Sequence, residues 1–410
     1  ETGFFDVSPL QWQAQWWGRL AGRTEGSPFV ASNRYRTEGE VQQNLNSQLK
    51  WVFGARLTHD LAANFEGKEF RDDYSRNKKP ELELWNAYAE VMMDSWRLRL
   101  GQQQVAWGET FGFFYADVIN PKDLRERSIG RLADLRLPVP MANLQWADRN
   151  LNLQFVYLPF FRPHRLPTTR SDYFPGFQQD LTLPVETTST YKTKGHLGDV
   201  GGRLSLTTYG TDISLLHFSH IDRQPYYLLS PDSNSARILL RPHHERIETS
   251  GLTFSSEINE WILRAENLYT PDRAYNILAN NNIVKGHFAQ RVHVLGLDLP
   301  RNGKSQWGIQ ASLDTVSGEK TQPIARSKEV SLATVRWAYD MDEAGVFELL
   351  ESFEFQKQSS LLQSKYTRPL SESYQWEAGV DFFSGSKDSL FGQTSRASRV
   401  FLAIRGSFSG

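Results

Sequence analysis

The chain has 410 residues, of which 39% are hydrophobic and 13% aromatic, and its 46 basic and 47 acidic side chains leave a net charge of −1. A net charge so close to zero provides no positive electrostatic potential for binding nucleic acid, so no nucleic-acid partner is expected. The sequence contains no cysteine, which excludes disulfides, thiolate metal sites, iron–sulfur clusters and a cysteine nucleophile.

Hydrophobic and polar residues alternate with period two along most of the chain. Between residues 41 and 57, Val41, Trp51 and Leu57 share one parity, and Gln42 and Arg56 share the other. On a β-strand the two parities face opposite sides. No run of 18 apolar residues occurs, so no transmembrane helix is expected. A transmembrane strand needs only about 9–11 residues with every second one apolar, and this alternation fulfils that need.

The alternation predicts 18 strands, or 16 if the weaker ones do not form. They are expected near residues 10–20, 41–58, 63–70, 83–93, 96–107, 141–147, 150–160, 200–209, 212–221, 245–258, 261–269, 287–299, 305–316, 328–339, 346–357, 360–369, 373–384 and 396–408. An even number of strands places both termini at the same end of a barrel.

The links between these strands alternate between short and long. Short links are expected at 59–62, 94–95, 148–150, 210–211, 259–260, 301–304 and 340–345, and long ones near 21–40, 71–81, 108–140, 161–199, 222–245, 270–286 and 317–327. Transmembrane barrels have short periplasmic turns and long outer loops. A soluble sandwich, the alternative for an alternating sequence, has no reason to keep this order along the whole chain.

The pattern therefore predicts an all-β fold, a single transmembrane antiparallel up-and-down barrel spanning residues 1–410. Its apolar parity would face lipid, and its lumen would be lined by Gln, Asn, Arg, Glu and Asp. Closure is expected because a sheet in lipid cannot leave backbone groups unpaired at an edge. An arginine at Leu98 or Ala378 should then hinder membrane folding by roughly 2–4 kcal/mol if the residue lies near the membrane midplane. The same change at Gln103 or Gln310, on the polar parity, should be tolerated.

One long link, residues 108–140, carries apolar residues and charges of both signs, which is typical of a functional loop. We predict that it folds into the lumen as a constriction or plug and pairs with Arg97, Arg99, Glu90 or Glu266. A solvated outer loop is the alternative. The candidate lumen and constriction residues are Arg97, Arg99, Gln103, Trp107, Glu109, Asp117, Asn120, Lys122, Asp123, Arg125, Arg127, Arg131 and Arg136.

The sequence around this link resembles a known family. Three stretches are similar to motifs of DUF1302, a Gram-negative domain of unknown function. They are Gln103, Trp107 and Gly108, then Asp117-Val118-Ile119-Asn120-Pro121-Lys122-Asp123, and then Leu135-Arg136-Leu137-Pro138. Ala106 is a mild departure, and the motif match covers residues 101–161. The resemblance implies an outer-membrane β-barrel that serves as a channel or transport component, often linked to inner-membrane exporters of hydrophobic cargo.

The leading hypothesis is an outer-membrane channel or export conduit for a polymer, hydrophobic or small-molecule cargo. It would lie in the Gram-negative outer membrane, in contact with the lipid bilayer and lipopolysaccharide, and periplasmic or inner-membrane transport partners are possible. Charges of both signs in the lumen argue against a strongly anion- or cation-selective porin. The alternative is a scaffold barrel that binds a lipoprotein or another envelope protein.

An enzyme is not expected. The sequence contains no Gly-x-Ser-x-Gly nucleophile elbow, although residues distant in sequence can still form a triad. No cofactor is expected either. His243-His244-Glu245 is the strongest metal candidate, but adjacent residues on an extended chain point to opposite faces, so no metal site is predicted.

Overall fold

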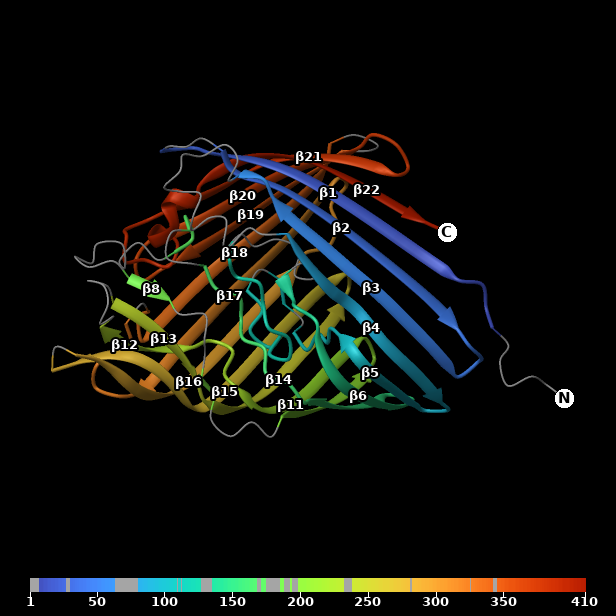
Figure 1. Ribbon diagram of the computed structural model, residues 1–410, viewed down its shortest axis with the longest axis horizontal. Coiled ribbons are helices and arrows are strands. Elements are labelled where there is room, and N and C mark those ends of the chain that lie inside the picture. Colours follow the sequence, from blue (N-terminus) through green and yellow to red (C-terminus); the bar gives the residue numbers. More distant parts are fainter. Residues whose placement is uncertain are drawn as a thin grey trace.

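The computed structural model describes residues 7–26, 30–62, 80–108, 110–111, 113–126, 135–167, 171–174, 185–187, 192–193, 198–231, 238–280, 282–324, 326–341 and 345–410. These residues form an 18-stranded antiparallel sheet whose first strand pairs with both the second and the last, so the sheet closes into a barrel (Figure 1). The predicted fold class and strand number are therefore confirmed. Within the described residues, no helix is long and apolar enough to cross a membrane.

The barrel strands pair in chain order. They are β1 (Gln11–Arg23), β2 (Val30–Asn44), β3 (Leu49–Asp60), β4 (Glu81–Met93), β5 (Trp96–Gln103), β6 (Val139–Asp148), β7 (Leu151–Leu158), β10 (Asp199–Thr208), β11 (Thr211–Ile221), β14 (Arg246–Ile258), β15 (Trp261–Ala279), β16 (Asn282–Asp298), β17 (Ser305–Gly318), β18 (Glu329–Asp340), β19 (Val346–Glu354), β20 (Ser359–Pro369), β21 (Tyr374–Ser384) and β22 (Arg399–Ser409). A smaller sheet contains β8 (Val185–Thr187), β9 (Lys192–Thr193), β12 (Tyr226–Pro231) and β13 (Ile238–His244), and the 3₁₀ helix η3 (Gly392–Ala397) precedes β22.

The strand boundaries near the N-terminus differ from those predicted. The single strand expected at 41–58 is a hairpin, because the chain reverses at residues 45–48, where Oδ1 of Asn46 accepts the N–H groups of Gln48 and Leu49 at 2.8 and 2.7 Å. A four-residue turn preserves the period of two, so the hairpin looks like one strand in the sequence. The predicted loop at 21–40 consequently contains most of β2.

Three other predicted segments also change. The short link expected at 59–62 begins within β3, at the end of that strand opposite the 45–48 turn. The strand expected at 63–70 lies outside the described residues. The loop expected at 270–286 is instead a hairpin, because β15 and β16 continue through it to Ala279 and Asn282.

The outer surface follows the predicted apolar parity. Leu100, Leu204 and Leu402 are 39–54% exposed although they are large and hydrophobic, as expected for side chains that face lipid. Aromatic side chains gather at the short-turn end. Trp307 and Trp337 stack with ring centroids 5.5 Å apart beside the link at 299–304. Tryptophans at this position match the aromatic girdle that a transmembrane barrel has at the membrane interface.

The lumen is only partly polar. Along the arc from β6 to β16 the inward parity carries a buried apolar cluster that includes Met141, Val156, Phe218, Leu268 and Val294. The predicted lining of Gln, Asn, Arg, Glu and Asp therefore holds only in part for this arc, where Asn143, Gln154 and Glu266 share the inward face with apolar side chains. These strands have lipid on one face and the packed 104–138 link on the other, so both of their faces lie away from water and apolar side chains are favoured on each.

Candidate functional site

The link between β5 and β6, residues 104–138, is named the inward segment because its described residues contact the lumen face on all sides. Figure 1 shows it inside the ring of strands. Its contacts include Arg125 with Glu81 of β4, Thr110 N–H with Glu266 of β15, Phe113 carbonyl with Gln310 of β17, and Glu126 with Arg19 of β1.

Trp107 anchors the inward segment in the apolar cluster. Its side chain is fully buried (0% exposed), its ring lies 6.1 Å from that of Phe218, and its Nε1–H donates to Oε1 of Gln154 at 2.9 Å. Gly201 makes this packing possible, because a Cβ there would lie 2.7 Å from Phe218 and 2.9 Å from Trp107. From Gln154, the buried hydrogen bonds continue through Asn143 to the side chain of Gln103.

The family motif ties the two ends of the inward segment together. Asn120 is buried, with its Oδ1 accepting the Val105 N–H at 2.8 Å and its Nδ2 donating to the Leu137 carbonyl at 2.9 Å. Asp117 pairs with Arg136 at 2.7 Å. Because these bonds are buried, each satisfies a group that would otherwise be costly to desolvate. The motif residues therefore determine how the segment folds.

Of the four wall residues that were expected to pair with the inward segment, one forms hydrogen bonds with it. Glu266 accepts the N–H groups of Thr110 and Ala116 at 3.1 and 3.0 Å. Arg99 instead pairs with Glu90, and Arg97 lies 4.0 Å from the same carboxylate. Arginine and glutamate on neighbouring strands of one face satisfy each other, and in the described part of the chain no ion pair joins these three side chains to the segment.

A second set of charges fixes the segment to β4. Arg125 donates to both Asp123 and Glu81, at 2.6 Å each, and Arg165 from the next long link reaches Glu81 and Glu83. Burial alone would raise the pKa of Asp123, but the hydrogen bond and charge of Arg125 and the charge of Arg165 hold it below the ordinary range. The carboxylate therefore stays ionised and keeps both arginines in place.

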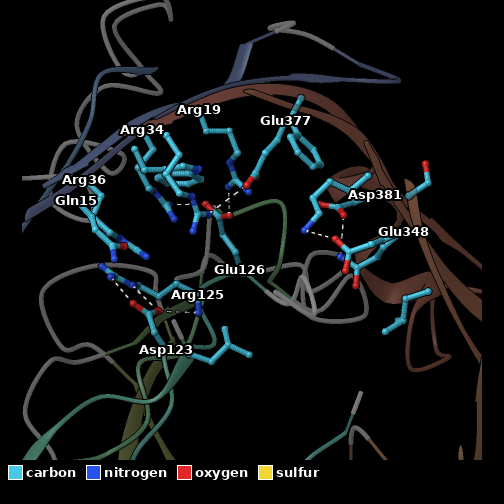
Figure 2. A pocket seen from close by; sticks show the side chains of 18 of the residues that line it. Gln15, Arg19, Arg34, Arg36, Asp123, Arg125, Glu126, Glu348, Glu377 and Asp381 are labelled. Carbon is cyan, nitrogen blue, oxygen red and sulfur yellow. Dashed lines mark hydrogen bonds and ion pairs between the residues drawn. The ribbon is translucent and has the colours of Figure 1, made fainter. Parts of the chain in front are cut away.

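A cavity of about 440 Å³ lies between the inward segment and the wall formed by β1, β2 and β18 to β22. Figure 2 shows charged side chains of both signs pointing into it. The wall contributes Gln15, Trp17, Arg19, Arg34, Arg36, Glu38, Arg336, Glu348, Leu350, Gln363, Lys365, Glu377, Asp381, Phe401 and Arg405, and the segment contributes Phe111, Phe114, Asp123, Arg125, Glu126 and Leu135.

The predicted site residues separate into groups in the structure. Asp123 and Arg125 line the cavity. Six others belong to the packing of the segment: Gln103, Trp107, Asp117, Asn120, Lys122 and Arg136. Arg97 and Arg99 lie on β5, outside the cavity lining. Glu109, Arg127 and Arg131 lie outside the described residues.

Sequence reasoning missed the arginines that the barrel wall contributes to the cavity. Arg19 and Arg405 lie on the polar parity of strands that were predicted, so their parity was the available signal. Arg34 and Arg36 were hidden because their strand, β2, was taken for a loop. Among the described residues, no three His, Asp or Glu side chains converge as metal ligands.

His164 lies where two inward-turned links meet. The backbone N–H of Lys122 donates to its Nδ1 at 2.8 Å, so that nitrogen carries no proton. Burial, together with the charges of Lys122 and Arg223, places the pKa of His164 well below its ordinary value of 6.5. The imidazole is therefore neutral in the folded protein at neutral pH.

We expect acid to destabilise this junction. Below pH 6.5 the unfolded chain protonates His164 but the folded chain does not, so stability is complete above that pH and falls as pH decreases, by at most about 1.4 kcal/mol per pH unit. Urea titrations of vesicle-folded protein at pH 7.5 and pH 5 measure the loss. His164→Asn, whose Oδ1 can accept the same N–H, should lose less stability than the wild type. An equal loss in both proteins would contradict the assignment.

Comparison with known proteins places the chain in a family. A family model described as "Protein of unknown function (DUF1302)" matches residues 22–353. The chain belongs to this family. The resemblance seen in residues 101–161 is thus confirmed and extends over most of the sequence. No protein of curated function matches the sequence significantly.

Solved structures resemble the chain in fold. Acinetobacter baumannii OccAB1 aligns with a TM-score of 0.59 and 7% identity, covering 100% of this chain and 98% of that one. Pseudomonas aeruginosa OccD3 (OpdP) gives 0.55 and 11%, covering 100% and 92%, and OccK1 (OpdK) from the same organism gives 0.54 and 8%, covering 98% and 99%. At such low identity these similarities establish the barrel fold of Gram-negative outer-membrane proteins.

Proposed function

We propose that the protein is a channel of the Gram-negative outer membrane that passes small solutes through the cavity beside the inward segment. The observation that carries the proposal is this cavity of about 440 Å³, which lies inside a closed barrel and is lined by charged side chains of both signs. A volume of this size accommodates a small molecule. Lipid-facing apolar residues on the outside of the same strands support the membrane location.

In this proposal the inward segment is the constriction. A barrel of 18 strands is wide enough to need narrowing if it is to select its solute. The segment meets that need because buried packing at Trp107 and ion pairs at Arg125 and Glu126 hold it against opposite parts of the wall. Selectivity would then depend on local contacts in the remaining space, as in other narrow pores.

Because the sequence has no cysteine, a single introduced thiol can test the route. Gln15→Cys places a thiol on an exposed residue of the cavity lining, and Ser47→Cys places one in the exposed turn at 45–48 as a control. We expect a methanethiosulfonate reagent to reduce the planar-bilayer current of Gln15→Cys and to leave that of Ser47→Cys unchanged.

The opposite results are equally informative. Equal sensitivity of the two variants would place the current outside the cavity. If neither the wild type nor a variant lacking residues 110–135 carries current, the channel proposal fails and a scaffold role, in which the filled lumen holds an envelope partner, takes its place.

A further inference from the structure

Three arginines of the barrel wall converge on the carboxylate of Glu126. Arg19 of β1 and Arg399 of β22 reach Oε2 at 2.6 and 2.9 Å, and Arg34 of β2 pairs with Oε1. Figure 2 shows Glu126 reaching up from the inward segment toward Arg19 and Arg34. We name Arg19, Arg34 and Arg399 the arginine trio. Multiple charged donors around one carboxylate form a strong anion site.

The site has more donors than Glu126 can satisfy. Three buried donors have no hydrogen-bond acceptor among the described residues: Nε of Arg19, Nη2 of Arg399 and Nε1 of the adjacent Trp17. The side chain of Arg399 is only 2% exposed, so bulk water does not readily replace an acceptor there. A buried donor without an acceptor is destabilising, so the site favours further oxygen atoms.

Two other carboxylates face the arginine trio, but they belong to the wall. Asp381 on β21 pairs with Nε of Arg399 at 2.9 Å, and Asp60 on β3 lies 3.7 Å from Nε of Arg34. Both carboxylates are held by continuous strand ladders. Glu126 lies in the link between strands instead, so it is the carboxylate that can leave without breaking the barrel.

Apolar groups adjoin the same site. The guanidinium of Arg19 lies 5.1 Å from the ring centre of Trp17 and 5.8 Å from that of Phe401. Phe111 and Phe114 of the inward segment face the cavity as well. A ligand here would therefore place its charge on the arginines and its body against carbon.

We propose that the arginine trio is a carboxylate-binding site and that Glu126 is an internal occupant, displaced by the carboxylate of a solute with an apolar body. The inference rests on the proposed channel function and adds the chemical class of its solute. One carboxylate leaves as another enters, so the three guanidinium groups stay paired throughout. This matters because an unpaired charge in a buried site is costly.

Equilibrium binding tests the exchange without requiring any current. Hexanoate and its neutral analogue hexanamide are titrated calorimetrically into detergent-folded wild type, Glu126→Gln and Glu245→Gln. The last variant removes a carboxylate that pairs with Lys285 and lies outside the cavity lining. Glu126→Gln should bind hexanoate about tenfold or more tightly than the wild type, because a tethered competitor at high effective concentration is lost. Glu245→Gln should match the wild type, and hexanamide should bind to none of the three.

Two further variants make the test complete. Glu126→Asp keeps the charge but shortens its reach, and it should bind hexanoate with intermediate affinity, which also decides the question if Glu126→Gln does not fold. Adding Arg19→Gln to Glu126→Gln should abolish binding. Equal hexanoate affinity in the wild type, Glu126→Asp and Glu126→Gln, or equal binding of hexanamide, would overturn the proposal. Tight hexanoate binding by a protein that carries no current would retain this site and reject the channel.

Discussion

Replacing Trp107 with alanine is expected to lower the free energy of unfolding by about 3–5 kcal/mol, the usual cost of deleting a buried indole. The side chain is 0% exposed and lies in the cluster that joins the inward segment to the wall. Its removal would leave a cavity beside Phe218 and would also leave Oε1 of Gln154 without its donor. The loss should therefore fall in the upper part of this range.

Urea-induced unfolding of vesicle-folded protein, followed by tryptophan fluorescence, measures this effect. Trp261→Ala is the matched control, because Trp261 is 43% exposed beside the 259–260 turn and its truncation leaves no internal cavity. We expect a clearly smaller loss there. Similar losses for Trp107→Ala and Trp261→Ala would show that the inward segment contributes little to the stability of the barrel.

Replacing Ala378 with arginine is expected to hinder folding into bilayers by about 2–4 kcal/mol, the cost of a charge near the membrane midplane. Ala378 lies on the lipid parity of β21, four residues beyond Tyr374, whose ring contacts that of Phe408 at the short-turn end of the barrel. Leu98 is on the same parity of β5 but only two residues from Trp96. Because the cost decreases toward the interface, arginine at Leu98 should cost only about 0–1 kcal/mol. Of the two positions named from the sequence, we therefore expect the midplane cost at Ala378 and not at Leu98.

Gln375→Arg is the control for Ala378→Arg. It lies on the lumen parity of the same strand, where its side chain contacts Glu377. Gln103 and Gln310, which the sequence suggested as tolerant positions, are 1% and 2% exposed and bonded to the inward segment through Asn120 and Phe113. We therefore expect arginine to be disruptive at both. Equal refolding yields and midpoints for Ala378→Arg and Gln375→Arg would contradict the assignment of the two faces.

The motif shared with the family has a structural meaning in this chain. Asn120, Asp117 and Arg136 bond within the inward segment, and Trp107 bonds to the wall. None of the four lines the cavity. These four motif residues therefore determine how the inward segment folds, whereas Asp123 and Leu135 of the motif, together with side chains outside it such as Arg19, line the cavity.

The sequence by itself determined the fold class, the outward face of most strands and the end that carries most of the short turns. Each of these follows from a local rule, because the alternation of side chains assigns a residue to one face of its strand. Local rules failed at residues 45–48, where a turn preserves the alternation. They failed again along β6 to β16, where apolar residues occupy both faces.

The tertiary structure alone decided which residues meet across the lumen. Glu126 is separated by 107 residues from Arg19 and by 273 from Arg399, yet all three share one site. Alternation tells which side chains point inward but not which strands the inward segment approaches. That choice depends on the fit of Trp107 beside Gly201 and on the bonds of Asn120. This packing directs Glu126 toward the arginine trio, which lies where the first strand pairs with the second and the last.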